Sequence, residues 1–270
     1  MIYAILTEQS IGRLFMAGIL PGILLLTLFL LTVLLLCTLK PSLGPKGPST
    51  TLAEKRRAFL GAIPILVVIL LTIGGIYTGI FSPTEAAGVG AALVIGIGAL
   101  SGTLDLRSFW QAAQSSVVTT ASVMLILIAA HLINPFIALS HLPAEVSRML
   151  VSFDLGAYGT LVLILAIYLV LGCFLEGLAM LVLTLPIFMP VVMSLGIDPI
   201  WFGVLVVLTL EMGLISPPVG INVFIVKSVA KNVPLIDIFW GVIPFWLAML
   251  VTLGLLVAIP QLSLWLPGMM

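Results

Sequence analysis

Two adjacent prolines, Pro217 and Pro218, interrupt a stretch that is apolar enough to be buried in a membrane. Proline has no backbone N–H, so two helical hydrogen bonds are lost, and the ring of Pro217 pushes Ser216 away from helical geometry. Inside a bilayer, backbone groups without partners are tolerated only where protein or a watery cavity satisfies them. Discontinuous helices of this kind hold substrates and ions in secondary transporters. The break therefore predicts a binding site within a membrane.

The composition agrees with that setting. Of 270 residues, 62% are hydrophobic and 7% are charged, whereas a soluble domain has about 25% charged residues. Ten basic and ten acidic residues cancel, so net charge gives no reason to expect a nucleic-acid partner. Cys37 and Cys173 lie in apolar runs, His131 and His141 have no neighbours at metal-ligand spacing, and no catalytic motif is present. We expect an all-α polytopic membrane protein that is not an enzyme.

Charged residues fall between long uncharged windows, and a spanning helix needs about 20 apolar residues. The predicted windows are 14–38, 59–81, 84–102, 115–139, 158–195, 201–230 and 238–266. Short amphipathic surface helices are expected at 104–114 and 142–153. Half of the ten basic residues lie between the first and second windows, which places that loop in the cytoplasm by the positive-inside rule; they are Lys40, Lys46, Lys55, Arg56 and Arg57. In the last window, we expect Trp240, Trp246 and Trp265 to be interfacial aromatic residues.

The window 158–195 is too long for one simple span, and Gly172, Glu176 and Gly177 divide it. An acid in an apolar window costs about 2.5–3.5 kcal/mol on insertion scales, and such residues usually face a cavity or a partner. Glycines on both sides allow the chain to turn. The pattern favours a re-entrant hairpin with arms over 158–172 and 178–194. The alternative is two ordinary spans joined by a solvated loop that contains Glu176.

Around the proline pair, Glu211 and Gly213 come before the break, and Gly220 and Asn222 come after it. Freed carbonyl groups and the side-chain oxygens of Ser216 and Asn222 are hard ligands that suit a small cation. The half-helix after Pro218 presents N–H groups and a positive dipole end to an anion. A plain proline kink is the structural alternative.

A third motif comprises Ser82, Pro83, Thr84 and Glu85. Ser82 or Thr84 can cap a helix, Pro83 suits its first position, and Glu85 complements the helix dipole. This motif predicts a helix start and carries no chemistry of its own.

These segments, taken in order, resemble the large membrane subunit of tripartite ATP-independent periplasmic (TRAP) transporters. The similar stretches are 5–12, 17–22, 75–86, 172–177, 196–199 and 216–220. The resemblance implies a sodium-driven elevator transporter of inverted-repeat design in the bacterial inner membrane, with sodium as coupling ion and no other cofactor. It also implies a periplasmic substrate-binding protein, a smaller membrane subunit, and organic acids as substrates. The implied binding residues are Gly172, Glu176, Gly177, Gly213, Ser216, Pro217, Pro218, Gly220 and Asn222, with Ser216 and Asn222 as sodium ligands.

The likeness covers only the second half of such a subunit. Residues 1–57 are therefore expected to be an N-terminal remnant with one span and the basic loop, and residues 58–270 a second transport repeat. The absent N-terminal half would then be a further partner, and this chain alone would fold poorly. The rival interpretation is a membrane scaffold or assembly subunit without transport activity of its own.

Overall fold

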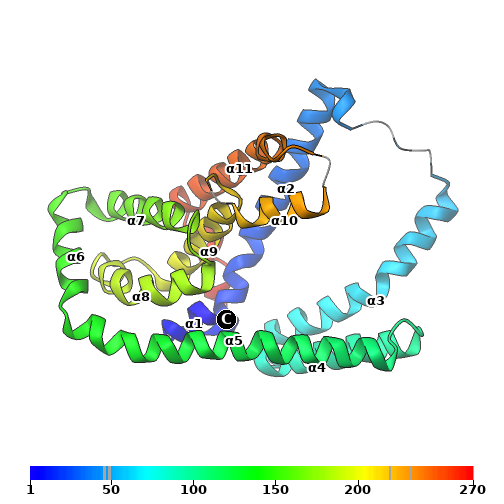
Figure 1. Cartoon of the computed structure of the whole chain (residues 1–270), viewed down its shortest axis with the longest axis horizontal. Coiled ribbons are helices and arrows are strands. Elements are labelled where there is room, and N and C mark those ends of the chain that lie inside the picture. Colours follow the sequence, from blue (N-terminus) through cyan, green and yellow to red (C-terminus); the bar gives the residue numbers. More distant parts are fainter. Residues whose placement is uncertain (45–46, 48–49, 219, 231–232, 270) are drawn as a thin grey trace. The chain divides into compact units, whose positions relative to one another are not determined.

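The computed structural model describes residues 1–270 except 45–46, 48–49, 219, 231–232 and 270, so the predicted loop residue Lys46 lies outside the described residues (Figure 1). Every regular element in the described part is a helix. The elements are α1 (Ile2–Leu6), α2 (Ile11–Leu39), η1 (Pro41–Leu43), α3 (Leu52–Tyr77), α4 (Pro83–Leu100), α5 (Leu106–Leu139), α6 (Leu142–Ser152), α7 (Gly156–Gly172), α8 (Gly177–Ser194), α9 (Pro199–Ile215), α10 (Ile221–Val229), α11 (Leu235–Ala258), α12 (Gln261–Leu264) and η2 (Pro267–Met269).

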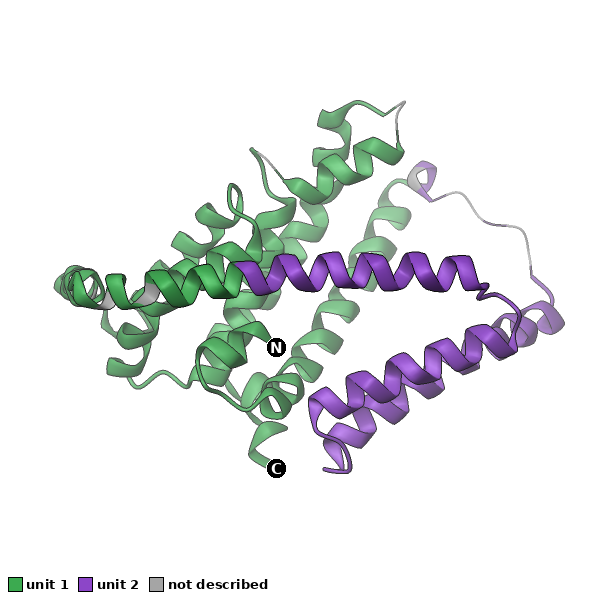
Figure 2. Cartoon of the chain, turned by 60° about the horizontal axis from the view of Figure 1, so that its bottom comes forward, with its two compact units in different colours: residues 1–40, 126–270 green, residues 41–125 purple. Residues whose placement is uncertain are grey.

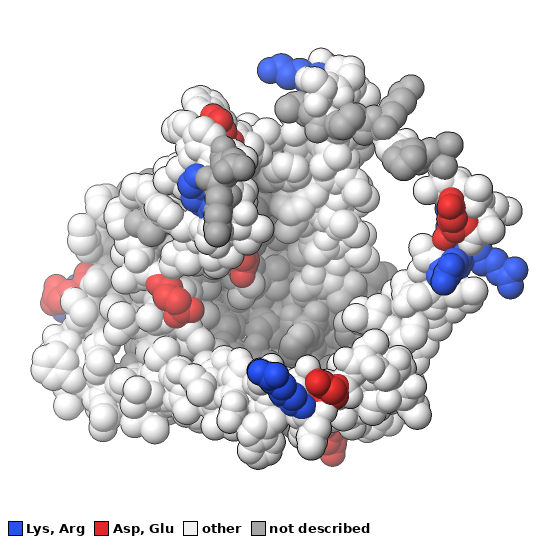
Figure 3. Space-filling model, turned by 45° about the vertical axis from the view of Figure 1, so that its right-hand side comes forward, with Lys and Arg blue, Asp and Glu red and all other residues white. Residues whose placement is uncertain are grey.

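Six of these helices are long and apolar enough to cross a membrane among the residues that the structure describes: α2, α3, α4, α5, α8 and α11. Long apolar side chains on them are exposed; Leu30 and Leu34 of α2, for example, are 63% and 60% exposed. Charged side chains are sparse on the face drawn in Figure 3. The chain is thus an all-α polytopic membrane protein, as the sequence predicts.

The chain forms two compact units, one of residues 1–40 with 126–270 and one of residues 41–125 (Figure 2). The boundary runs through α5. These two units are defined by which residues pack together. The predicted division into residues 1–57 and 58–270 concerns transport repeats, and it stays a prediction.

The smaller unit holds the helix pair α3 and α4. Both helices begin with a reciprocal capping box, in which a hydroxyl and a glutamate satisfy backbone N–H groups. In α4 the cap is Ser82, whose backbone N–H donates to Glu85 at 2.8 Å, while the Glu85 N–H donates to the Ser82 hydroxyl at 3.3 Å. The predicted start of this helix is confirmed, with Ser82 rather than Thr84 as the cap.

In the larger unit, α9 is the central helix and packs against α2, α7, α8, α10, α11 and α12. Buried apolar side chains surround it, including Tyr168 of α7, Met180 of α8 and Phe202 of α9 itself. The indole N–H of Trp201 donates to the Leu256 carbonyl of α11 at 2.9 Å. Ten of the 17 residues of α9 are buried, so this helix is a fixed element that ends at the break.

Helices α7 and α8 form the predicted hairpin, with arms at Gly156–Gly172 and Gly177–Ser194. A buried hydrogen bond of 2.8 Å joins the hydroxyls of Thr184 and Tyr168 across the two arms. Its re-entrant position in a membrane stays a prediction.

Two predicted boundaries were wrong. No separate surface helix forms at 104–114, because no glycine or proline interrupts the chain there and α5 runs on from Leu106. The last helix ends at Ala258 instead of 266, because Pro260 disfavours helical geometry at Ile259, where φ is −129°.

Candidate functional site

The tip of the hairpin lies directly against the end of α9. Gly172 ends α7, and Gly213 lies one turn before the break. A Cβ added to Gly213 would lie 2.7 Å from both the Cα and the carbonyl carbon of Gly172. Only residues without side chains permit backbones to approach so closely. The sequence placed these two glycines in separate motifs, and the structure brings them together.

Ser216 is the hydrogen-bonded centre of the break. It is 6% exposed, and its extended backbone ends α9. Its hydroxyl donates to the Met212 carbonyl at 2.7 Å and accepts from the indole N–H of Trp246 at 2.7 Å. The Cys173 side chain at the hairpin tip donates to the Leu169 carbonyl at 3.3 Å and lines the same pocket as Ser216. One hydroxyl thereby connects α9 to α11 in a pocket that the hairpin tip also lines.

The prolines leave carbonyl oxygens without helical donors. In a continuous helix, the N–H groups of residues 217 and 218 would bond to the carbonyls of Gly213 and Leu214. Gly213 instead accepts from the Ser216 N–H at 3.0 Å. Among the described residues, the Leu214 carbonyl has no such replacement. The broken end of α9 therefore offers a carbonyl oxygen two residues before Ser216 in the chain.

Helix α10 starts on the other side of the break. Gly220 precedes it with φ of +57°, a conformation that favours glycine. Among the described residues, no side chain caps this helix start; the Val223 N–H donates to the Gly220 carbonyl at 2.8 Å, and the N–H groups of Ile221 and Asn222 stay open. Asn222 is half-buried in the first turn, and no described residue bonds to its amide side chain. The open N–H groups can receive an anion.

A pocket of about 480 Å³ adjoins the break. Its walls come from α7, the hairpin tip, the end of α9 and α11, and they include Cys173, Ser216, Pro217, Phe239 and Trp246. Ser216 and Pro217 are the members of the predicted site set among its lining residues. The pocket is apolar apart from a few groups, as small-molecule sites usually are.

Glu176 caps α8. Its carboxylate accepts the N–H groups of Leu178 and Ala179, each at 3.1 Å, and is exposed. Gly177 follows it as the first residue of α8, where an added Cβ would lie 4.0 Å from Leu210. Pro218 is exposed beside Pro217. The structure thus gives Glu176 a structural task at the hairpin tip that the sequence did not anticipate.

Sequence reasoning missed the role of Trp246. It was predicted to be an interfacial aromatic residue, yet it is half-buried and bonded to Ser216. The exposed Trp240 and Trp265 show no comparable contact among the described residues. Only the fold brings residues 30 positions apart into contact; nothing local in the sequence signals it.

A discontinuous helix against the tip of a helical hairpin, in a polytopic membrane protein, is an arrangement of secondary transporters. Comparison with known proteins agrees. A family model described as "Tripartite ATP-independent periplasmic transporter, DctM component" matches residues 1–262. The chain belongs to this family.

Three relatives share about the same level of identity. The C4-dicarboxylate TRAP transporter large permease protein DctM of Pseudomonas aeruginosa is 33% identical and matches 99% of this chain. The sialic acid TRAP transporter large permease protein SiaM of Vibrio cholerae is 32% identical and matches 98% of it. The isethionate TRAP transporter permease protein DctMQ of Oleidesulfovibrio alaskensis is 30% identical over 99% of it. The chain spans 62%, 62% and 42% of the length of these relatives, respectively. All three are named as transporter permeases and not as enzymes.

Proposed function

We propose that the chain is part of a sodium-coupled transporter that imports small organic acids across the bacterial inner membrane. The observation that carries this proposal is the packing of the hairpin tip on the broken end of α9, with Ser216 in the pocket that both line. The junction holds the coupling ion and contributes half of a substrate pocket.

The groups at the break suit sodium. Hard cations take oxygen ligands such as hydroxyl and carbonyl groups. The Ser216 hydroxyl and the Leu214 carbonyl supply such oxygens, and the amide of Asn222 supplies a third. Because Trp246 already donates to Ser216 and the hydroxyl proton goes to Met212, Ser216 has one remaining lone pair to offer.

The substrate class follows from the start of α10 and from the relatives. Open N–H groups and the positive end of a helix dipole favour an anionic group. The relatives are named for C4-dicarboxylates, sialic acid and isethionate, all of which are organic acids. An organic acid with a carboxylate or a similar anionic group therefore fits the break, with the apolar walls of the adjoining pocket receiving its carbon skeleton.

The proposal includes partners. A periplasmic substrate-binding protein delivers the acid, and a smaller membrane subunit accompanies the chain. An N-terminal half related to this chain by inverted symmetry completes the pocket. The support is the family membership together with the greater length of the relatives.

The test is uptake of a radiolabelled organic acid by proteoliposomes that contain the complete transporter and its binding protein. We expect uptake with a sodium gradient and not with a potassium gradient. Ser216→Ala should remove the sodium stimulation. Ser194→Ala, which deletes a hydroxyl bonded to the Val191 carbonyl within α8, should retain it.

Uptake that is unchanged without sodium and without the binding protein would refute the mechanism. Absence of any uptake, together with an intact complex, would favour the scaffold interpretation.

A further inference from the structure

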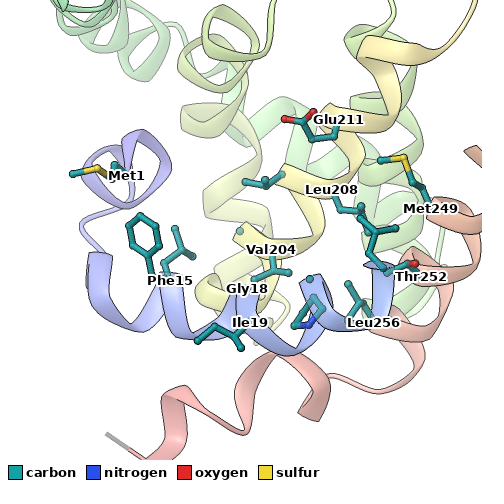
Figure 4. Close-up of a pocket in the computed structure, with 16 residues that line it drawn as sticks. Met1, Phe15, Gly18, Ile19, Val204, Leu208, Glu211, Met249, Thr252 and Leu256 are labelled. Atoms are coloured by element: carbon teal, nitrogen blue, oxygen red, sulfur yellow. The ribbon is translucent and has the colours of Figure 1, made fainter. Parts of the chain in front are cut away.

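A second pocket of about 480 Å³ lies between α2, α9 and α11, all within the larger unit. Figure 4 shows Val204, Leu208 and Glu211 along α9, with the Glu211 carboxylate at one end of the pocket. Its size falls within the range of about 300–1,000 Å³ that is usual for small-molecule sites.

This pocket is separate from the hairpin junction. Successive residues of an α-helix are about 100° apart around the helix axis. The side chain of Glu211 therefore points about 100° away from the direction of Leu210 and about 160° away from that of Gly213. Leu210 and Gly213 face α7, because a Cβ added to Gly172 would lie 3.8 Å from the Leu210 carbonyl and 3.2 Å from the Gly213 Cα. The pocket and the proposed transport site thus lie on different faces of α9.

The walls of the pocket are apolar and leave open space. A Cβ added to Gly18 or Gly22 of α2 would have no atom within 4 Å. The one hydroxyl in the lining, that of Thr252, already donates to the Ala248 carbonyl at 2.9 Å. Leu208 and Leu256 contribute further apolar surface. A ligand would therefore meet hydrocarbon on most of its surface.

Glu211 is the acidic side chain in this lining. Among the described residues, no basic side chain and no hydrogen-bond donor contacts its carboxylate. Glu211 is exposed at the pocket, and a carboxylate that faces the interior of a membrane is costly unless it has a partner. A cation that also fills an apolar pocket would supply that partner.

We propose that this pocket binds a primary ammonium group attached to an apolar chain, with the ammonium on Glu211. An ammonium group donates up to three hydrogen bonds and compensates the carboxylate charge. A quaternary ammonium has no N–H to donate, an alcohol has no charge, and a carboxylate would be repelled. Free alkylamines and the headgroup of phosphatidylethanolamine share the required chemistry.

The test is photolabelling of the complete transporter in phosphatidylcholine nanodiscs. The probe is a medium-chain alkylamine with a diazirine in its chain, and the alcohol of the same chain is the matched control. The amine should label peptides that contain Phe15 or Leu208 about tenfold more than the alcohol does, as expected for a charged hydrogen bond. Labelled peptides are identified by mass spectrometry.

Two variants test separately the charge of Glu211 and the open volume of the pocket. Glu211→Gln should abolish the preference for the amine, whereas Glu145→Gln on the surface should leave it unchanged. Gly18→Leu fills the open space next to α2 without altering charge and should abolish labelling by both probes. Leucine is also a better helix former than glycine, so loss of the helix would not explain that result.

Nanodiscs that contain phosphatidylethanolamine distinguish the two ligand sources. If the lipid headgroup occupies the pocket, it should suppress labelling by the amine; if a free amine is the ligand, labelling should persist. Equal labelling by amine and alcohol, or an unchanged preference in Glu211→Gln, would overturn the proposal. Crosslinking of the probe to another polypeptide in the complete transporter, with these peptides unlabelled, would overturn it too and show that protein covers the groove.

Discussion

Replacement of Gly213 by alanine tests the close approach of α7 and α9. The added Cβ would lie 2.7 Å from two backbone atoms of Gly172 and 3.0 Å from its carbonyl oxygen, against at least 3.4 Å for an ordinary contact. Because the obstructing atoms are backbone, a rotamer change cannot relieve the clash, and the two helices must move apart.

The magnitude follows from two opposing terms. Overpacking a well-packed site costs about 1–3 kcal/mol. Alanine regains about 1 kcal/mol over glycine in a helix. The expected net loss is therefore about 1–2 kcal/mol in the free energy of unfolding, measured by titration with a denaturing detergent and circular dichroism.

Gly254→Ala in α11 is the matched control. A Cβ there has no atom within 4 Å, so this variant should be as stable as the parent chain or slightly more stable. Equal stability of the two alanine variants would refute the direct contact between the hairpin tip and the end of α9.

The same titration tests three further variants. Thr184→Val removes the buried partner of the Tyr168 hydroxyl and should lower the free energy of unfolding by about 1–3 kcal/mol, whereas Thr27→Val, on the exposed side of α2, should change it by less than about half as much. Gly220→Ala forces alanine to φ of +57° and should cost about 1–2 kcal/mol; no loss would mean that the break is held differently. Ser82→Ala removes the helix cap and should cost about 1 kcal/mol, with faster amide exchange confined to the first turn of α4.

The helices and the break could be predicted from local sequence. Glycines at 172 and 177 limit the two hairpin arms, and the proline pair ends α9 because it removes backbone donors. Ser82 and Glu85 define the start of α4. Where prediction failed, as at the start of α5, the change from an amphipathic stretch to an apolar one at residue 115 was taken for a helix boundary although the backbone had no reason to break.

The contacts of the site could not be predicted in this way. Glu176 looked like an intramembrane ligand, and its capping of α8 depends on the local turn geometry. The bond from Trp246 to Ser216 depends on how α11 packs against α9, which hydrophobic periodicity does not determine. A binding role of Asn222 stays a prediction.

The sodium dependence of Cys173 reactivity tests the central claim most directly. Cys173 and Ser216 line the same pocket at the break, so a cation bound there should alter the access of reagent to Cys173. In the complete transporter with Cys37→Ala, we expect sodium, and not potassium, to change the rate at which a membrane-impermeant thiol reagent modifies Cys173. Ser216→Ala should remove that effect. Fast modification of Cys173 at one rate with or without sodium would contradict a cation site between the hairpin tip and the broken helix.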